Sequence, residues 1–182
     1  LPSQTSVEDP TRPGLFYHLV QTSARPVYAV SFLHLAPKSE QSKTVIGWLP
    51  ATTETTSESS ESAEEEAGLQ DFVPNQPFLD ILHTSIQKAL EKGRDAVIVA
   101  EALNRESGWL HINDSRNVPA LGRIGDPDDI IGTVLVEDGK VVPSTYQRMP
   151  SYRVCTSDGV TQLSEGLDAE LRENLSSTHE AE

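Results

Sequence analysis

Residues 76–92 read QPFLDILHTSIQKALEK, and this stretch is the clearest sign of regular structure in the chain. Pro77 suits the first turn of a helix, where no backbone N–H is required, and Gly93 is typical of the position just beyond a helix end. Between them, apolar residues recur mostly every three or four positions and so share one helix face. They are Phe78, Leu82, Ile86, Ala89 and Leu90. The stretch therefore predicts an amphipathic helix.

Strand-like runs lie on both sides of this helix. Before it, three runs are rich in aromatic and β-branched side chains, at residues 15–21, 27–35 and 43–49. After it, a continuous apolar run at 96–100 indicates a strand buried on both faces. Further strands are predicted at 109–112, 133–136, 140–142, 152–156 and 160–163. Short connections such as Asp138-Gly139 indicate hairpins, and hence antiparallel pairing.

A second helix is predicted near the end of the chain. Ser164 is a suitable N-cap, and three leucines follow at steps of four along one helix face, ending at Leu175. The strands, together with two helices at about 76–92 and 164–175, predict an α+β fold. We expect a single domain with a mostly antiparallel sheet.

Both ends and one insertion have compositions typical of flexible chain. Residues 1–13 are rich in proline and polar residues and predict a flexible N-terminal arm, and residues 176–182 predict a flexible tail. Residues 52–68 contain six Glu, no Lys or Arg, and no large apolar side chain. Such a segment cannot bury enough surface to offset the entropy cost of ordering it. It predicts a disordered acidic insertion within a domain that spans 14–175.

The overall composition argues against several classes of protein. The 182 residues include 14 Lys and Arg against 28 Asp and Glu, and the formal net charge of −14 argues against binding of nucleic acid or anionic membranes. No apolar run approaches the ~20 residues of a membrane-spanning helix, so we expect a soluble protein without a transmembrane segment. The single cysteine, Cys155, cannot form an internal disulfide and indicates a reducing compartment.

Residues 113–130 form a long stretch without clear periodicity. Ordered loops longer than about 12–15 residues are uncommon in compact domains and are usually functional or disordered. Val118, Leu121 and Ile124 are apolar residues that could anchor this loop to the rest of the domain. Two interpretations stay open: the loop forms part of a binding surface, or it is a long connection fixed by its apolar residues.

Acidic residues in this loop suggest a cation site, but their spacing does not support one. Asp126, Asp128 and Asp129 place three carboxylates within four residues, and hard cations prefer such oxygen ligands. A calcium-binding loop would require Asp or Asn and then Gly where this chain has Ile130 and Ile131. No Cys/His cluster, dinucleotide-binding motif or P-loop is present. The sequence therefore predicts neither a metal nor a cofactor.

One histidine is the first candidate for an acid or base. His111 alternates with Trp109 and Asn113 on the predicted strand that leads into the long loop. Cys155 lies within a predicted strand, without the helix N-terminus or the nearby charged histidine that lowers a thiol pKa. No Gly-x-Ser-x-Gly motif of a serine hydrolase is present. The sequence leans against an enzyme but leaves the question open.

Residues 144–153 read STYQRMPSYR and interleave tyrosine with arginine. Both residue types are enriched in interface hot spots, because each covers a large area and still offers a polar tip. The predicted binding residues come from this segment and the long loop: Arg116, Arg123, Asp126, Asp128, Tyr146, Arg148, Tyr152 and Arg153. The alternative is that the tyrosines pack on the sheet and the arginines pair with the aspartates of the loop.

Two functions are compatible with these patterns. The first is a non-enzymatic accessory or assembly protein that binds a protein partner through the 113–130 loop and the 144–153 segment. The second is a small-molecule enzyme or carrier that binds an anionic ligand between the sheet and the same loop, with His111 as the acid or base. Its anion-binding arginines would be Arg116, Arg123 and Arg153, because arginine meets carboxylate or phosphate with two parallel hydrogen bonds.

Four motifs in the second half of the chain carry a resemblance. They are DPDDIIGTV at 126–134, Gly139-Lys140, YQRMPSYRV at 146–154 and GVTQL at 159–163. The chain resembles the C-terminal half of a fungal mitochondrial protein family whose chemistry is uncharacterised. This resemblance implies a mitochondrial location, with the cytoplasm as the alternative, and a transit peptide removed before Leu1. It implies nothing about catalysis.

Overall fold

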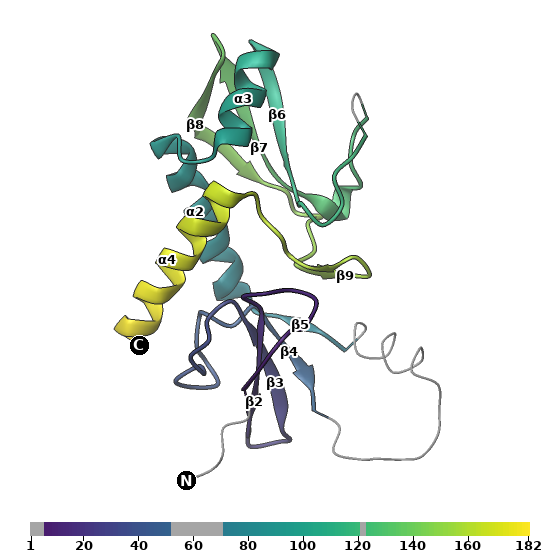
Figure 1. Ribbon diagram of the computed structural model, residues 1–182, viewed down its shortest axis with the longest axis vertical. Helices are drawn as coiled ribbons and strands as arrows, with labels where there is room; N and C mark the ends of the chain where they lie inside the picture. Colours follow the sequence, from purple (N-terminus) through teal and green to yellow (C-terminus); the bar gives the residue numbers. More distant parts are fainter. Residues whose placement is uncertain (1–5, 52–70, 121–122) are drawn as a thin grey trace. The chain divides into compact units, whose positions relative to one another are not determined.

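The structure, a computed structural model, describes residues 6–51, 71–120 and 123–182 (Figure 1). The insertion predicted at 52–68 and Leu121 of the long loop lie outside these residues. The described residues form antiparallel sheets and three helices, which confirms an α+β fold but adds one helix to the two predicted. The chain divides into two compact units, Leu1–Ile81 with Asn174–Glu182 and Leu82–Glu173.

The first unit is built on a five-stranded antiparallel sheet whose strands follow chain order. They are β1 (Ser6–Glu8), β2 (Phe16–Val20), β3 (Val27–Ser31), β4 (Gly47–Pro50) and β5 (Val73–Pro74). The fully buried side chains of Val30, Ile46 and Phe78 belong to its core. The predicted hairpin of β2 and β3 is confirmed, with all five residue pairs in register.

The first strand corrects the prediction of a flexible arm at 1–13. Ser6–Glu8 pairs antiparallel with β2, and the hydroxyl of Ser6 lies 2.7 Å from Nδ1 of His18. The other ring nitrogen of His18 lies 2.9 Å from the carbonyl oxygen of Leu33. Burial lowers the pKa of this histidine. The arm is ordered from Ser6 onward because the sheet supplies its backbone partners, which a composition dominated by proline and polar residues does not reveal.

The second unit contains a three-stranded antiparallel sheet in the order β6-β7-β8. Its strands are β6 (Gly108–Asn113), β7 (Ile130–Glu137) and β8 (Lys140–Arg148), followed by a short hairpin of β9 (Cys155–Thr156) and β10 (Gly159–Val160). The predicted turn at Asp138-Gly139 joins β7 to β8. β8 is longer than predicted and includes the first half of the 144–153 segment, so that half is a strand rather than a connection.

Helices α2 (Gln76–Lys92) and α4 (Glu165–Ala181) begin where the sequence predicts. The predicted apolar stripe of α2 is buried along its whole length. α4 continues past residue 175, so the prediction of a flexible tail at 176–182 is wrong. The hydroxyl of Ser42 and the backbone N–H of Lys43 donate to the carboxylate of Glu182, at 2.7 and 2.8 Å, and these bonds hold the end of the chain in place. Within the described ranges, no helix is long and apolar enough to cross a membrane.

The third helix, α3 (Ala96–Arg105), replaces the buried strand predicted at 96–100. Asp95 is its N-cap: the carboxylate accepts a hydrogen bond from the backbone N–H of Ile98 at 3.0 Å. Only Ile98 and Ala102 are buried, whereas the neighbouring valines are exposed. A short apolar run is ambiguous between strand and helix, and here the cap decides in favour of the helix.

Candidate functional site

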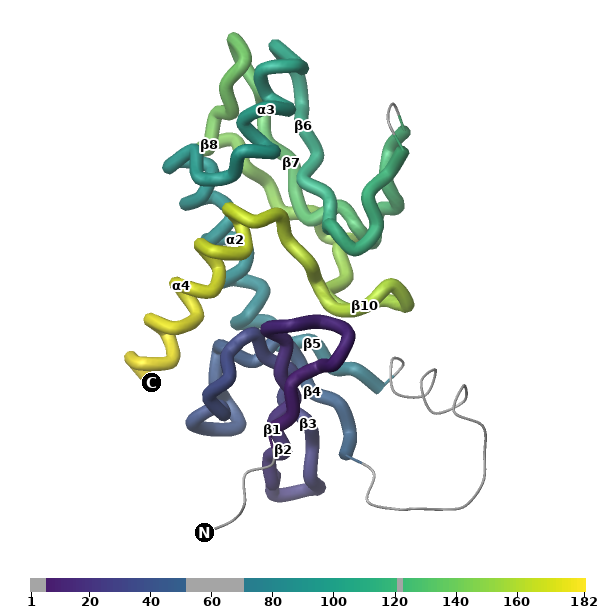
Figure 2. The backbone as a smooth tube through the Cα atoms, viewed as in Figure 1, coloured from purple at the N-terminus to yellow at the C-terminus, as the bar shows by residue number. Residues whose placement is uncertain are grey.

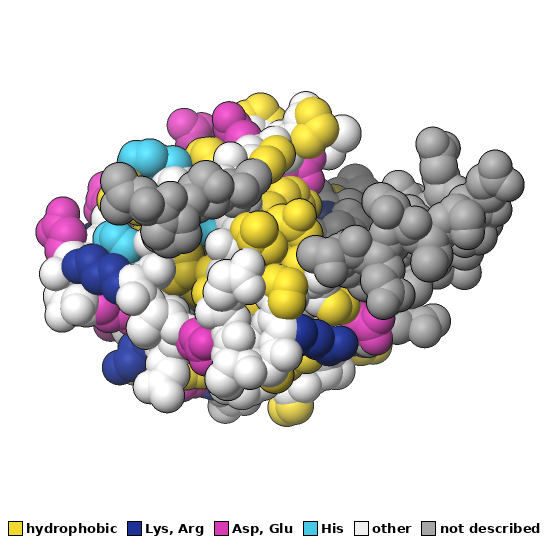
Figure 3. All heavy atoms as spheres, turned by 90° about the horizontal axis from the view of Figure 1, so that it is seen from below, with side chains coloured by type: hydrophobic (Ala, Val, Ile, Leu, Met, Phe, Trp, Pro, Cys, Tyr) yellow, Lys and Arg dark blue, Asp and Glu magenta, His cyan; other side chains and the backbone are white. Residues whose placement is uncertain are grey.

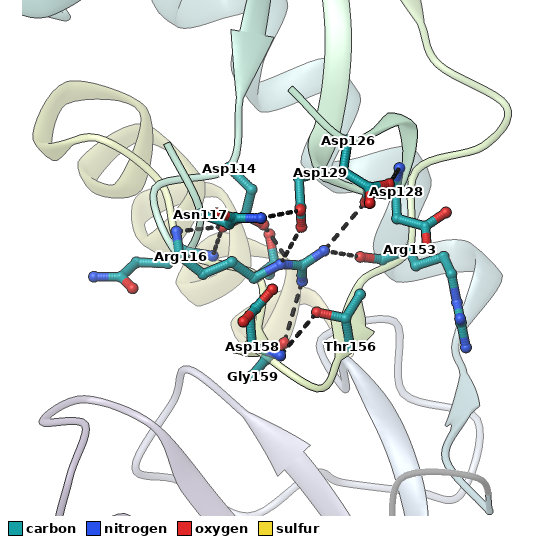
Figure 4. A network of polar contacts seen from close by, with 12 residues as sticks. Asp114, Arg116, Asn117, Asp126, Asp128, Asp129, Arg153, Thr156, Asp158 and Gly159 are labelled. Atoms are coloured by element: carbon teal, nitrogen blue, oxygen red, sulfur yellow. Dashed lines mark hydrogen bonds and ion pairs between the residues drawn. The ribbon is translucent and has the colours of Figure 1, made fainter. Parts of the chain in front are cut away.

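Arg116 lies at the centre of a polar network (Figure 4). Its guanidinium donates to Oδ1 of Asp129 at 2.9 Å, and its side chain is only 1% exposed. The remaining N–H groups reach backbone oxygens on three different segments. These oxygens belong to Asp128, Arg153, Val154 and Gly159. One buried arginine therefore ties the start of the long loop to its end and to the β9–β10 hairpin.

A buried carboxylate and a tyrosine complete this network. Asp114 is fully buried and accepts hydrogen bonds from the backbone N–H groups of Arg116 and Gln162, both at 3.0 Å. Its other oxygen accepts from the hydroxyl of Tyr152 at 2.6 Å, and that hydroxyl also bonds to Thr161. Burial, reinforced by the charge of Asp114, raises the pKa of Tyr152. The phenol is held in its neutral form as a structural link.

These contacts favour the second interpretation of the tyrosine and arginine pattern, in which the two residue types serve packing and ion pairing. The polar groups of the Arg116 and Tyr152 side chains form hydrogen bonds within the second unit. The Asp126 carboxylate accepts from the backbone N–H of Asp128 at 3.0 Å and so caps a short turn of 3-10 helix, Pro127–Asp129. The structure places no group of three or more His, Cys, Asp or Glu that could hold a metal ion among the residues it describes.

Tyr146 lies apart from this network. Its hydroxyl lies 2.7 Å from Nδ1 of His83 on α2, and burial raises its pKa. The ring of Tyr146 packs against Gly132. A Cβ at this position would lie 2.6 Å from a ring carbon, so only glycine leaves room for the tyrosine ring. Arg148 lines a cavity of about 400 Å³ beside this pair. The predicted Tyr/Arg patch is thus divided between two places.

A different group of residues gathers beside β6. Two adjoining cavities, of about 680 and 380 Å³, are lined by residues of this strand, of α3 and of the loop that leaves β6 and returns to β7. Figure 2 shows the course of that loop. Five residues line both cavities: Glu101, Arg105, Leu110, Asn113 and Arg123. We call the two cavities together the β6 groove. All of its lining residues belong to the second unit.

Two polar atoms at the groove lack partners. Nδ1 of His111 and Oδ1 of Asn113 are buried and accept or donate no hydrogen bond within the described ranges. Both residues line the smaller cavity. A buried polar group without a partner costs about 1–3 kcal/mol. A ligand group at this place would supply the missing hydrogen bonds.

The charges of the groove favour an anion. Arg105 and Arg123 form no ion pair with a described carboxylate. Burial raises the pKa of Glu101, and the charge of Arg105 opposes this rise. The two arginines exceed the one carboxylate by one positive charge, on a chain whose formal net charge is −14. On the face that Figure 3 shows, acidic and basic side chains are interspersed.

The structure brings together only part of the predicted site. His111 and Arg123 line the β6 groove, as the second predicted function requires, whereas Arg116 and Arg153 are absent from its lining. The sequence does not identify Glu101 and Arg105, because the apolar run at 96–100 predicts a strand there. Glu101 and Arg105 are four positions apart, so they would share one face of a helix. A helix prediction for this segment would therefore have grouped them.

Comparisons of the chain with models of protein families, with curated proteins and with solved structures find no match. The resemblance to a fungal mitochondrial family therefore stays a prediction. The protein is an α+β protein of two units, with a groove at one edge of the second unit's sheet. Its function has to be argued from the chemistry of that groove.

Proposed function

We propose that residues 82–173 form a binding unit that takes an anionic ligand into the β6 groove. One observation carries the proposal: two buried polar atoms without partners, on His111 and Asn113, lie in the lining that also contains Arg105 and Arg123. A folded protein rarely leaves buried polar groups unsatisfied, and such groups point to a ligand when they line a cavity. The positive charge of the two arginines indicates that this ligand is anionic.

The groove has the chemistry to recognise a carboxylate or a phosphate. A guanidinium presents a planar fork of N–H donors that matches either group with two parallel hydrogen bonds. Asn113 can accept a hydrogen bond through Oδ1, and His111 offers Nδ1 as a donor or an acceptor, depending on its tautomer. These four side chains would hold the polar end of a ligand.

The rim of the groove is apolar. Trp109 is 48% exposed, Val118 69% and Ile124 81%, and all three line one of the two cavities. Ligand sites typically combine such apolar surface with a few polar groups that fix orientation. The ligand that suits this groove therefore has an anionic group and an apolar part.

This proposal modifies both functions predicted from the sequence. It keeps the long loop and Arg123 as contacts with the ligand, and it keeps His111 as a polar contact rather than as an acid or base. It omits the 144–153 segment because the hydroxyls of Tyr146 and Tyr152 are engaged within the unit. A protein partner stays compatible with it, provided that the partner brings an anionic segment to the groove.

Thermal unfolding of the full chain tests the proposal. The panel contains inorganic phosphate, succinate, ATP, an acyl-CoA and a pool of short acidic peptides. A ligand present at 100 times its Kd should stabilise the protein by about 2.7 kcal/mol, which raises Tm by several degrees. The double variant Arg105→Gln, Arg123→Gln should lose this shift. Arg25 is an exposed arginine of the first unit, so Arg25→Gln should retain it. No shift with any compound, or an equal shift in all three proteins, would contradict the proposal.

A further inference from the structure

We infer that the ligand of the β6 groove is an extended peptide segment of a partner protein, which adds as a strand to the open edge of β6. This inference rests on the proposed function and names its class of ligand. β6 is the first strand in the order β6-β7-β8, so among the described residues it pairs with β7 alone. Its other edge borders the groove.

The hydrogen bonds of β6 show which backbone groups point to that edge. The hydroxyl of Thr133 on β7 donates to the carbonyl oxygen of Leu110 at 3.1 Å, so this carbonyl points toward β7. Backbone groups alternate in direction along a strand, which turns those of Trp109 and His111 toward the groove. Within the described ranges, the backbone of β6 forms no backbone hydrogen bond outside its ladder with β7. Two residues therefore offer unpaired N–H and C=O groups to an incoming strand.

The open edge of β6 carries little of the protection that edge strands usually have. Charged side chains, proline and bulges normally prevent such strands from pairing with other chains. Residues 108–112 read GWLHI, without a charge or a proline, and the one bulge lies beyond them, between Ile112 and Asn113. A strand of this kind is a template for a fourth strand, and peptides commonly bind in this way.

The walls of the groove define the peptide. A strand rises about 3.3 Å per residue, so the six residues of β6 can pair with a segment of about four to six residues. Arg105 and Arg123 would bind a carboxylate on that segment, either an acidic side chain or the chain terminus. Trp109 and Ile124 would cover apolar side chains. The expected ligand is an extended segment with one carboxylate among apolar residues.

Binding of synthetic peptides to the full chain tests this inference. The probes are fluorescein-labelled octapeptides with one Glu among Val, Ile and Tyr residues, measured by fluorescence anisotropy. The affinity should fall at least about tenfold in the double variant Arg105→Gln, Arg123→Gln and stay unchanged in Arg25→Gln. N-methylation of the peptide backbone should abolish binding at every second position only, because alternate N–H groups of a strand face the same side.

Amide hydrogen exchange gives a second measurement on the unmodified protein. A bound strand should slow exchange at the amides of Trp109 and His111 at least about tenfold, since these N–H groups would enter a new ladder. Succinate serves as a small dicarboxylate that can meet the arginines but cannot form the ladder. It should leave exchange at both amides unchanged.

The outcomes separate the inference from the proposed function. Peptide binding with the two-residue N-methylation pattern and protected amides supports both. Binding of succinate, phosphate or another small anion that depends on the arginines, without peptide binding, overturns the inference and leaves the proposed function standing. Dimers that form through β6 and exclude the peptide would also overturn it, and equilibrium sedimentation would detect them. If neither peptides nor small anions bind, both are overturned.

Discussion

At the scale of single residues, Arg116 is the most consequential side chain of the second unit. It is buried, it pairs with Asp129, and its guanidinium satisfies backbone oxygens from three segments. Removal of one partner from a buried ion pair leaves the other charge without compensation, which costs about 3–5 kcal/mol. We expect Arg116→Ala to lower the free energy of unfolding by about this amount in urea denaturation. Arg116→Lys should recover only part of it, because lysine lacks the planar fork.

Arg153 provides the matched control for this prediction. Its side chain is exposed, and it takes part in the network through its backbone N–H and carbonyl groups, so Arg153→Ala should change the free energy of unfolding by less than about 0.5 kcal/mol. An equal loss in the two variants would contradict a special role for Arg116.

Two buried tyrosines give the second unit a pH dependence on the alkaline side. Burial raises the pKa of Tyr146 and of Tyr152 above the value of about 10 that a tyrosine has in the unfolded chain. The folded state therefore keeps protons that the unfolded state releases. The resulting stability is complete below about pH 10 and is lost as the pH rises from there.

The double variant Tyr146→Phe, Tyr152→Phe should show this loss less steeply. Phenylalanine has no proton to release, so the slope of unfolding free energy against pH should be smaller between about pH 10 and pH 11.5. Urea denaturation at a series of pH values measures the slope in both proteins. Equal slopes would mean that neither phenol is held neutral by the fold, whatever the variant does to stability at pH 7.

At the scale of secondary structure, how well the sequence predicts an element depends on the length of its pattern. α2 has 17 residues, a regular apolar stripe and defined ends, and its prediction matches the structure. The run at 96–100 is too short to show a period, and the helix that forms there depends on Asp95. That carboxylate also accepts from the backbone N–H of Gly166, 71 positions along the chain. Such a contact cannot be inferred from local sequence.

Gly166 shows how closely α4 and the start of α3 pack. A Cβ on this glycine would lie 2.5 Å from Cα of Asp95 and 2.6 Å from the carbonyl oxygen of Arg94. Both are backbone atoms and cannot move aside at low cost. In a helix, alanine is favoured over glycine by about 1 kcal/mol, so helix propensity and this close contact affect stability in opposite directions.

We expect Gly166→Ala to destabilise the protein by about 1–3 kcal/mol, because overpacking outweighs the gain in helix propensity. The neighbouring exposed residue gives the control, since Glu165→Ala makes no such contact and should change stability by less than about 0.5 kcal/mol. Urea denaturation compares the two variants. A stabilised Gly166→Ala would contradict the observed packing of these elements.

At the scale of the whole molecule, the candidate site shows what sequence patterns leave out. The sequence predicts that His111 and Arg123 share a site, because one precedes the long loop and the other lies within it, and the structure brings both to the β6 groove. Arg105 joins them only because α3 forms and packs next to β6. Arg116 has the same residue type as Arg123 but faces buried carboxylates, and burial depends on tertiary packing rather than on spacing.

The division into two units predicts that each unit can unfold separately. Each unit buries its own apolar residues, for example Val30 and Ile46 in the first and Val134 and Val136 in the second. Local and subglobal unfolding follows such packed units. A change that weakens only the second unit should therefore leave amide protection in the first unit largely intact.

Arg116→Ala is the variant that tests this, with native-state hydrogen exchange in low urea as the measurement. Amides of β6, β7 and β8 should exchange at least about tenfold faster than in the unchanged protein, because 1.4 kcal/mol corresponds to a factor of ten and the expected loss is larger. Amides of β2 and β3 should change by less than about twofold. If protection falls equally in both sheets, the units unfold as one cooperative body, and the helices α2 and α4, which contribute residues to both units, are the elements that would couple them.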